Sequence, residues 1–199
     1  MTGVSLFDWE IYRHLFGGAE MERLFEERAT LARLVEVERA VSRAQGAVGI
    51  IPADAVGTMD AALDVEALDL ERLRADTRDV GRPIAGLVAQ LMEQAGDAGL
   101  WVHYGVTTYD TMDTGRVLQI RDGLAALQAD LDGVLHRLSA LAREHRDTLM
   151  IARTNNLHAQ SQTFGLKLAA WIEELRCHRD RLSAAAPRVL MVQFGGAVG

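Results

Sequence analysis

The sequence contains a single cysteine, Cys177, so it cannot form an internal disulfide bond. A lone thiol in a chain without a signal-like N-terminus indicates the reducing cytoplasm. Cys177 falls within a helical pattern, where we expect inert packing rather than a nucleophile. We therefore predict a cytoplasmic protein that its hydrophobic core stabilises without covalent links.

The sequence also lacks a net positive charge and long apolar runs. The formal net charge is -7, whereas a nucleic-acid-binding protein carries a basic surface. No apolar run approaches the roughly 20 residues that a membrane-spanning helix needs. The sequence therefore predicts that neither nucleic acid nor a membrane is a partner, although local arginines and helix N-termini can still bind anionic substrates.

Proline is scarce as well, with three residues in 199, and no segment of any length shows strand-like alternation. Both features favour an all-α fold. In the first half, apolar spacing and breaking residues predict helices over 19–47, 53–63, 65–76 and 83–94. This part, residues 1–105, is interpreted as a small N-terminal helical domain.

The second half carries apolar residues at heptad spacing through four heptads: Val117, Ile120, Leu124, Leu127, Leu131, Val134, Leu138 and Leu141. A second long helix follows from Phe164 to Val189, and the two are expected to run antiparallel. Their apolar stripes need further helices, from a missing C-terminal part or from other subunits. The glycine-rich end at 193–199 also indicates truncation. We therefore predict that residues 106–199 form the first part of a central bundle of long helices, whose C-terminal remainder is absent.

Two polar stretches can carry chemistry. In the first, Thr107-x-x-Asp110 has the spacing of a capping box, which starts a helix. One hydroxyl of Thr107 and Thr108 can cap while the other meets a carboxylate or phosphate at the helix N-terminus. His103 precedes this position in a glycine-containing loop, where a scaffold role is the alternative to ligand binding.

The second stretch combines Arg153, Thr154, an Asn155-Asn156 turn and His158 ahead of a helix. Arginine suits bidentate recognition of a carboxylate, and histidine can transfer protons near neutral pH. Thr163 either caps the next helix or lines a cleft. Spacing alone does not choose between these interpretations.

Both stretches resemble motifs of the fumarase/aspartase superfamily, on its adenylosuccinate lyase and 3-carboxy-cis,cis-muconate cycloisomerase branch. The pattern W-V-H-x-G-x-T-S-x-D-x-x-D-T is similar to 101–114, WVHYGVTTYDTMDT. The pattern G-R-T-H-x-x-H-A-x-P-x-T-F-G-x-K-x-A is similar to 152–169. The resemblance extends to Val35–Glu38, to Gly49–Pro52 and to the final Gly-Gly-Ala-Val-Gly, so it spans nearly the whole chain.

This resemblance implies a fumarase/aspartase-like helical homotetramer with active sites shared between subunits. It implies β-elimination from a substituted succinate, a dicarboxylate, with release of fumarate and without a metal or other cofactor. His103, Thr107, Thr108, Asp110, Arg153, Thr154 and Thr163 would bind substrate, with His103 and Asp110 shaping their loop, and His158 and Asn155 would be the catalytic positions.

Three departures from the pattern bear on mechanism. Asn155 replaces the histidine of many lyases and cannot shuttle protons; Leu157 replaces a common glutamine, and Ser161 a proline. Around 76–83 the important histidine of adenylosuccinate lyases is absent, and Arg82 is the nearest polar candidate. These departures argue against an ordinary adenylosuccinate lyase. They leave open a lyase with a non-standard leaving group such as nitrite, a muconate cycloisomerase, or a non-catalytic helical assembly protein.

The family's mobile loop, G-S-S-x-M-P-x-K-x-N, supplies the serine taken as the base. No such segment occurs in the 199 residues, so we expect the chain alone to be inactive.

Overall fold

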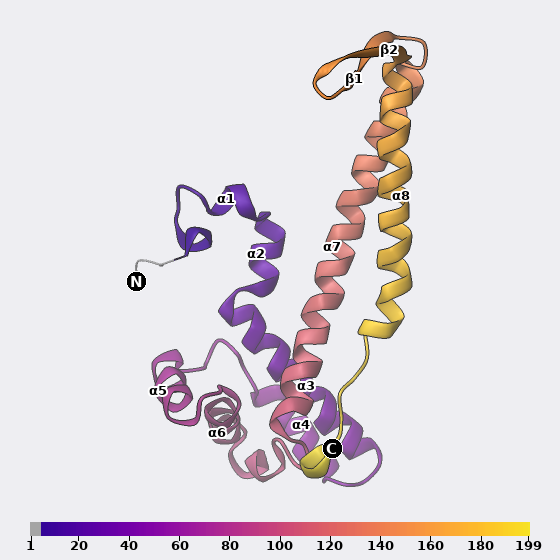
Figure 1. The fold of residues 1–199 in the computed structure, drawn as a ribbon. Coiled ribbons are helices and arrows are strands. Elements are labelled where there is room, and N and C mark those ends of the chain that lie inside the picture. Colours follow the sequence, from indigo (N-terminus) through magenta and orange to yellow (C-terminus); the bar gives the residue numbers. More distant parts are fainter. Residues whose placement is uncertain (1–4) are drawn as a thin grey trace. The chain divides into compact units, whose positions relative to one another are not determined.

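Nearly all regular structure is helical, as the scarcity of proline and of alternating segments predicts (Figure 1). The computed structural model describes residues 5–199. Its α-helices are α1 (Arg13–Phe16), α2 (Ala19–Phe25), α3 (Glu27–Ala47), α4 (Ala53–Ala62), α5 (Leu70–Val80), α6 (Ile84–Ala95), α7 (Thr108–Glu144) and α8 (Phe164–Val189). Short 3₁₀ helices span Leu6–Asp8, Gly96–Trp101 and Gly196–Val198, and two strands, β1 (Leu149–Thr154) and β2 (Leu157–Thr163), lie between α7 and α8. The all-α fold class is confirmed, with this hairpin as an addition.

Packing divides the chain into two compact units. One runs to Ile120 and includes Leu190–Gly199, and the other is Arg121–Val189. The division in the sequence falls between Ile120 and Arg121, within α7. The domain boundary expected between residues 105 and 106 stays a prediction. None of the described helices is long and apolar enough to cross a membrane.

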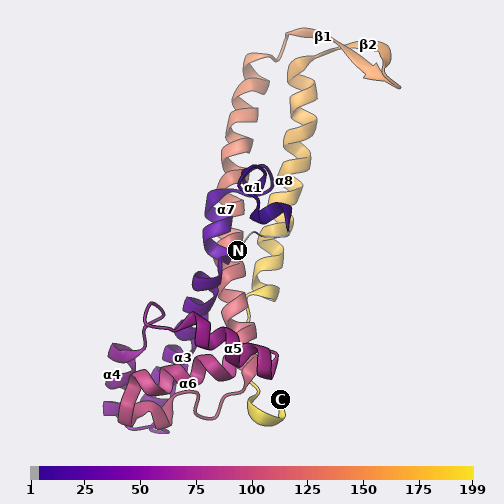
Figure 2. The ribbon, with the colours of Figure 1, turned by 90° about the vertical axis from the view of Figure 1, so that its left-hand side faces the viewer.

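The first unit has an apolar core made by α3, α4, α5 and α6 (Figure 2). Met59, Leu63, Leu87 and Leu91 are its largest fully buried side chains. The inner face of α3 contributes Leu31, Leu34 and Val35, and the same face continues with polar side chains, Glu38, Ser42 and Gln45, that are also buried. This change from apolar to polar along one helix face places hydrogen-bonding groups next to the core.

The single helix predicted for 19–47 is wrong, because the backbone is extended at Glu26 and separates α2 from α3. The Gln119 side chain stabilises this break. Its Nε2 donates to the carbonyl of Leu24 at 2.9 Å and to the Thr30 hydroxyl at 2.9 Å. The side chain thereby takes up a carbonyl near the C-terminal end of α2, which a local sequence pattern cannot reveal.

The helix predicted for 65–76 begins and ends later than expected. The Asp69 carboxylate accepts from the N–H groups of Glu71 and Arg72 at 3.0 and 3.1 Å, and so caps α5. Gly81, in the left-handed conformation at φ 83°, ends it. The helices predicted for 53–63 and 83–94 are confirmed as α4 and α6 to within a residue at each end.

In the second unit, α8 runs antiparallel to α7, as predicted (Figures 1 and 2). Gln128 Nε2 donates to the Ser183 hydroxyl at 3.4 Å, and Arg179 lies 3.6 Å from the Asp132 carboxylate. From one pair to the next, the residue number increases along α7 and decreases along α8, as expected for antiparallel helices. The Cys177 side chain on α8 is exposed, so its predicted packing role is not met within this chain.

Candidate functional site

The first polar stretch lies at the start of α7, where one half of the predicted capping box is found. The Asp110 side chain caps the helix start, whereas neither the Thr107 nor the Thr108 hydroxyl does, contrary to expectation. The Thr107 N–H donates to Asp110 Oδ2 at 3.0 Å, and the Thr107 carbonyl accepts from the Asp110 and Thr111 N–H groups at 3.0 and 3.4 Å. Thr107 is therefore the N-cap residue, and the carboxylate of the third helical residue reaches back to its N–H. The helix start predicted from this spacing is confirmed.

The hydroxyls of Thr107 and Thr108 have no hydrogen-bond partner among residues 5–199, and both side chains are half-buried. They stand at the N-terminus of a helix of 37 residues. The first turn of a helix presents N–H groups without intrahelical partners and the positive end of the helix dipole. Two available hydroxyls at this position can hold a carboxylate or a phosphate.

The Asp110 carboxylate ties the last described segment of the chain to this helix start. Its Oδ1 accepts from the Gly195 N–H at 2.8 Å, and its Oδ2 accepts from the Gly196 N–H at 3.0 Å in addition to that of Thr107. Burial opposes the charged form, but the N–H donors of Gly195, Thr107 and Gly196, with the nearby His103, outweigh it, so the pKa of Asp110 lies below its ordinary value.

Asp110 is 2% exposed, and both of its oxygens are engaged. We therefore assign it the shaping role expected from the resemblance, and not direct contact with a ligand. One turn further along the same face of α7, the Thr114 hydroxyl exchanges hydrogen bonds with the backbone of Gln193, both at 3.1 Å. Asp110 and Thr114 together hold residues 193–196 along the first two turns of α7.

His103 is held from α3. Its Nδ1 lies 2.7 Å from Glu38 Oε1, which also accepts from the Thr111 hydroxyl at 2.8 Å. The backbone of His103 has φ 60°, a left-handed conformation that a non-glycine residue rarely adopts. Gln45 Nε2 donates to the neighbouring Tyr104 carbonyl. Two side chains of one helix thus hold the loop that precedes α7.

Glu38, Thr111 and Gln45 are not among the predicted site residues, although Glu38 and Thr111 lie in stretches that carry the resemblance. A signal for Glu38 exists in the sequence, since it continues the spacing of Leu31, Leu34 and Val35 on the inner face of α3. A glutamate on an apolar stripe indicates a buried carboxylate with a specific partner.

The second polar stretch forms the tip of the β1–β2 hairpin. Asn155 and Asn156 occupy its two-residue loop, with φ 46° and 62°. Positive φ at both positions defines the type I′ turn, which matches the twist of antiparallel strands, and asparagine tolerates it. The predicted asparagine turn is therefore found, but between two strands. The strands escaped prediction because apolar and polar residues do not alternate along them.

The pairing register sets Arg153 opposite His158 and Thr154 opposite Leu157. Side chains that lie directly opposite each other share one face of the hairpin, with Cβ atoms about 5 Å apart. All of these side chains are exposed, as is that of Asn155. The hairpin therefore brings a guanidinium and an imidazole together next to the turn, an arrangement that can bind a carboxylate and move a proton.

Thr163 lies at the other end of β2, paired with Leu149, and caps α8. Its hydroxyl accepts from the Leu166 N–H at 3.1 Å. Gly165 packs so closely against the end of α7 that an added Cβ would lie 2.7 Å from the Ala142 carbonyl oxygen. Of the two roles considered for Thr163, the geometry supports the cap, while contact with substrate stays a prediction.

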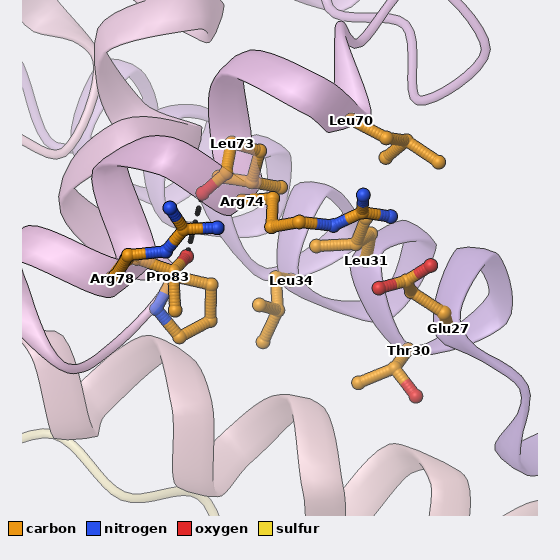
Figure 3. A pocket seen from close by; sticks show the side chains of 10 residues that line it. Glu27, Thr30, Leu31, Leu34, Leu70, Leu73, Arg74, Arg78 and Pro83 are labelled. Carbon is orange, nitrogen blue, oxygen red and sulfur yellow. Dashed lines mark hydrogen bonds between the residues drawn. The ribbon is translucent and has the colours of Figure 1, made fainter. Parts of the chain in front are cut away.

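Two cavities of the first unit contrast with these polar stretches. A cavity of about 480 Å³ is lined by four leucines of α3 and α5 (Leu31, Leu34, Leu70 and Leu73), and Figure 3 shows the Arg74 and Arg78 side chains beside them. It also includes Thr77 and Pro83, from the 76–83 stretch, but not Arg82. The other, of about 470 Å³, is an apolar groove between α3, α7 and residues 192–194. Of the predicted site residues only Asp110 lines either cavity, and both of its carboxylate oxygens are engaged.

The candidate site residues thus form two groups, each within its own unit. His103, Thr107, Thr108 and Asp110 gather at the start of α7, while Arg153, Thr154, Asn155 and His158 gather at the hairpin tip. Among the described residues, no three histidine, cysteine or acidic side chains are arranged to hold a metal ion.

The structure is thus that of a helical protein with long antiparallel helices and polar groups at the start of α7 and in the hairpin between α7 and α8. The family model described as lyase matches residues 18–199. The chain therefore belongs to this lyase family, within the fumarase/aspartase superfamily. Adenylosuccinate lyases and 3-carboxy-cis,cis-muconate cycloisomerases are both among its relatives, so the predicted branch is confirmed.

Individual relatives match more than nine tenths of this chain. An N-acetyl-S-(2-succino)cysteine lyase from Dickeya dadantii is 37% identical over 98% of this chain and 43% of its own length. A fumarate lyase structure from Mesorhizobium sp. BNC1 is 47% identical with a TM-score of 0.86, over 92% of this chain and 43% of its own. A 3-carboxy-cis,cis-muconate lactonizing enzyme structure from Pseudomonas putida is 36% identical with a TM-score of 0.91, over 95% of this chain and 44% of its own.

The chain thus spans less than half the length of these relatives. The activity, substrates and partners of the whole protein are therefore matters for proposal.

Proposed function

We propose that the full-length protein is a lyase resembling adenylosuccinate lyase, which eliminates a leaving group from a substituted succinate and releases fumarate without a cofactor. The observation that carries this proposal is the pair of Thr107 and Thr108 hydroxyls, without partners among the described residues, at the N-terminus of α7 beside His103. These groups hold one substrate carboxylate. Its charge interacts favourably with the helix dipole, and the hydroxyls supply hydrogen bonds.

The hairpin tip provides the groups for the second half of the reaction. Arg153 binds a carboxylate or orients it, and His158, opposite Arg153, transfers a proton. In the elimination, a base removes a proton from one carbon, the electron pair forms the carbon–carbon double bond, and the leaving group departs from the adjacent carbon with its bonding electrons. The family resemblance assigns the base to the serine of a mobile loop, which no segment of these 199 residues matches.

Asn155 narrows the choice of leaving group. Its amide hydrogen-bonds but cannot donate a proton outright, so the departing group receives less general-acid assistance than a histidine would give. A group that is stable as an anion tolerates this loss. Nitrite and thiolates belong to this class, whereas an amine does not. The related Dickeya enzyme is named for a succinyl thioether, which supports a thiolate or a similar leaving group.

A muconate cycloisomerase is the second candidate within enzymes. It is supported by the 36% identity and the TM-score of 0.91 to the Pseudomonas putida lactonizing enzyme. A non-catalytic assembly protein is the candidate of another class, because it would tolerate Asn155. The presence of Thr107, Thr108, Arg153 and His158 together argues against it, since a scaffold needs none of them.

We further propose that the protein is a homotetramer. On α7, the heptad residues Leu127, Val134 and Leu141 are 40–46% exposed although α8 lies alongside. On α8, Trp171 is 48% exposed. Helices that carry such stripes are typically covered in a bundle, and copies of the same chain supply the missing helices.

The function is tested with the full-length protein and a series of substituted succinates that differ in leaving group, including an amine, a thioether and a nitro compound. We expect fumarate to appear, by its ultraviolet absorbance, with the largest kcat/KM for the thioether or nitro compound. Lactone formation from 3-carboxymuconate without fumarate formation would move the protein to the cycloisomerases. Absence of both reactions would support the assembly protein.

Replacing Asn155 with histidine is expected to raise kcat/KM for the amine substrate by at least about tenfold, because a general acid becomes available to the departing nitrogen. Histidine is also among the residues that tolerate the left-handed conformation of this turn. The measurement compares amine and nitro substrates, and the nitro compound is expected to change little. Asn156→His, in the same turn, is the matched control. Equal acceleration of both substrates would contradict the role of Asn155.

A further inference from the structure

Glu38 is a buried carboxylate whose two oxygens have different surroundings. The residue is 3% exposed on the inner face of α3. Its Oε1 accepts from Thr111 and lies against His103 Nδ1, at 2.8 and 2.7 Å, while Oε2 is buried without a partner among the described residues. One oxygen therefore makes both contacts of this side chain, and the other makes none.

This arrangement is unfavourable for folding. A buried carboxylate loses its hydration, and an oxygen left without a hydrogen bond recovers none of that loss. The neighbours of Glu38 on the same helix face are Leu31, Leu34 and Val35. An apolar side chain at this position would continue the stripe and remove the unpaired oxygen, and such replacements of buried ionic groups are often neutral or stabilising. Glu38 therefore contributes something other than stability.

The contact with His103 indicates what that contribution is. When Glu38 is ionised, its oxygens only accept hydrogen bonds, and the contact at 2.7 Å then places the proton of the imidazole on Nδ1. Nε2 then remains for a ligand, and the His103 side chain is 19% exposed, so it is reachable. The strained φ of 60° at His103 fits a ring that is held in place for binding.

We propose that Glu38 is a positioning residue that holds the His103 ring through its Nδ1–H, so that Nε2 faces the substrate and, with the ring protonated, donates a hydrogen bond to an anionic group there. Through the Thr111 hydroxyl, the same Oε1 atom is tied to the first turns of α7, which carry Thr107 and Thr108. Glu38 thus fixes the position of the His103 ring relative to Thr107 and Thr108. This inference rests on the proposed function, since it assumes an anionic substrate at the start of α7.

Glu38→Leu in the full-length protein tests the inference directly. The variant removes the acceptor and keeps the apolar stripe of α3. We expect kcat/KM for the substrate found in the fumarate assay to fall by about tenfold, the scale on which outer hydrogen-bond partners of functional histidines act. We expect the thermal midpoint to stay unchanged or to rise. If the thermal midpoint of Glu38→Leu fell together with its kcat/KM, the contact between Glu38 and His103 would be an ordinary structural ion pair. That result would overturn the proposal.

Two further variants keep the test decisive. Glu38→Gln retains an acceptor oxygen and is expected to lose less activity than Glu38→Leu; equal losses would contradict the need for an acceptor. Glu36→Gln makes the same chemical change on an exposed residue of the same helix, and is expected to leave kcat/KM unchanged.

A double-mutant cycle shows whether Glu38 acts through His103. The single variants Glu38→Leu and His103→Gln are each expected to lower kcat/KM, and the double variant is expected to be no worse than the lower of the two. Independent roles would instead multiply the two losses, and that result would overturn the proposal.

The ¹⁵N chemical shifts of the His103 ring separate this inference from the proposed function, because their measurement needs no substrate. In the wild-type protein at a pH where the ring is neutral, we expect the Nδ1–H tautomer, and in Glu38→Leu a mixture dominated by Nε2–H. If the wild-type protein forms no fumarate but shows the Nδ1–H tautomer, the proposed function fails and the positioning of His103 by Glu38 stands. The Nε2–H tautomer in the wild-type protein would overturn the positioning role whatever the activity.

Discussion

A Thr108→Ala variant of the full-length protein is expected to lose about 10- to 100-fold in kcat/KM for its dicarboxylate substrate. A hydrogen bond to a charged group contributes about 1.5–3 kcal/mol, and loss of such a bond in the transition state has this effect on the rate. The Thr108 hydroxyl has no partner in the described part of the chain, so its removal breaks no internal hydrogen bond. The thermal midpoint is therefore expected to change little, and steady-state kinetics report the lost contact with substrate.

Thr108→Ser is the matched control, because it keeps the hydroxyl and removes only the methyl group. We expect it to retain most of the wild-type kcat/KM. If Thr108→Ala retains full activity, the carboxylate is not held at the start of α7, and the central observation behind the proposed lyase loses its meaning. If serine and alanine are equally impaired, the methyl group and not the hydroxyl is what matters.

Those features of the fold that depend on local pattern were predictable from sequence. The heptads of α7 and the Thr107-x-x-Asp110 spacing fix the path and the start of a helix through contacts within a few residues. The break at Glu26 was not predictable, because the side chain that stabilises it, Gln119, lies 95 residues from Leu24. The β1–β2 hairpin was not predicted for another reason. Its strands are mostly exposed on both faces, so no alternation marks them.

The candidate site divides in the same way. Thr107, Thr108 and the asparagine turn were found from short motifs, because their roles follow from local backbone geometry. The long-range contacts that hold this region were not predicted. Glu38 reaches His103 across 65 residues, and Asp110 reaches Gly195 across 85. The sequence therefore predicted the groups that are proposed to face a ligand, whereas the structure showed how Glu38 and Asp110 position them.

Among these positioning groups, Asp110 is expected to have the largest effect on stability. Asp110→Asn in the full-length protein is expected to lower the free energy of unfolding by about 2–4 kcal/mol at neutral pH. Three backbone N–H groups donate to the wild-type carboxylate, two of them to Oδ2. An asparagine keeps one oxygen and turns an NH₂ group toward the remaining donors, which leaves buried N–H groups unpaired. Urea unfolding of the wild-type and variant proteins measures the difference. Asp113→Asn, on the exposed side of the same helix, is the control and is expected to change little.

The pH dependence of this difference tests which influence on Asp110 dominates. The pKa of Asp110 is lowered in the folded protein from an ordinary value of 3.8, because the N–H donors outweigh burial. The stabilisation is then fully present above the ordinary value and is lost as the pH falls through the lowered one. The difference between wild-type and Asp110→Asn proteins should therefore stay constant from pH 7 to about pH 4.5 and narrow only below pH 4. Narrowing that begins between pH 7 and 5 would mean that burial dominates and raises the pKa. In that case the backbone of Gly195 and Gly196 could not be what keeps Asp110 charged.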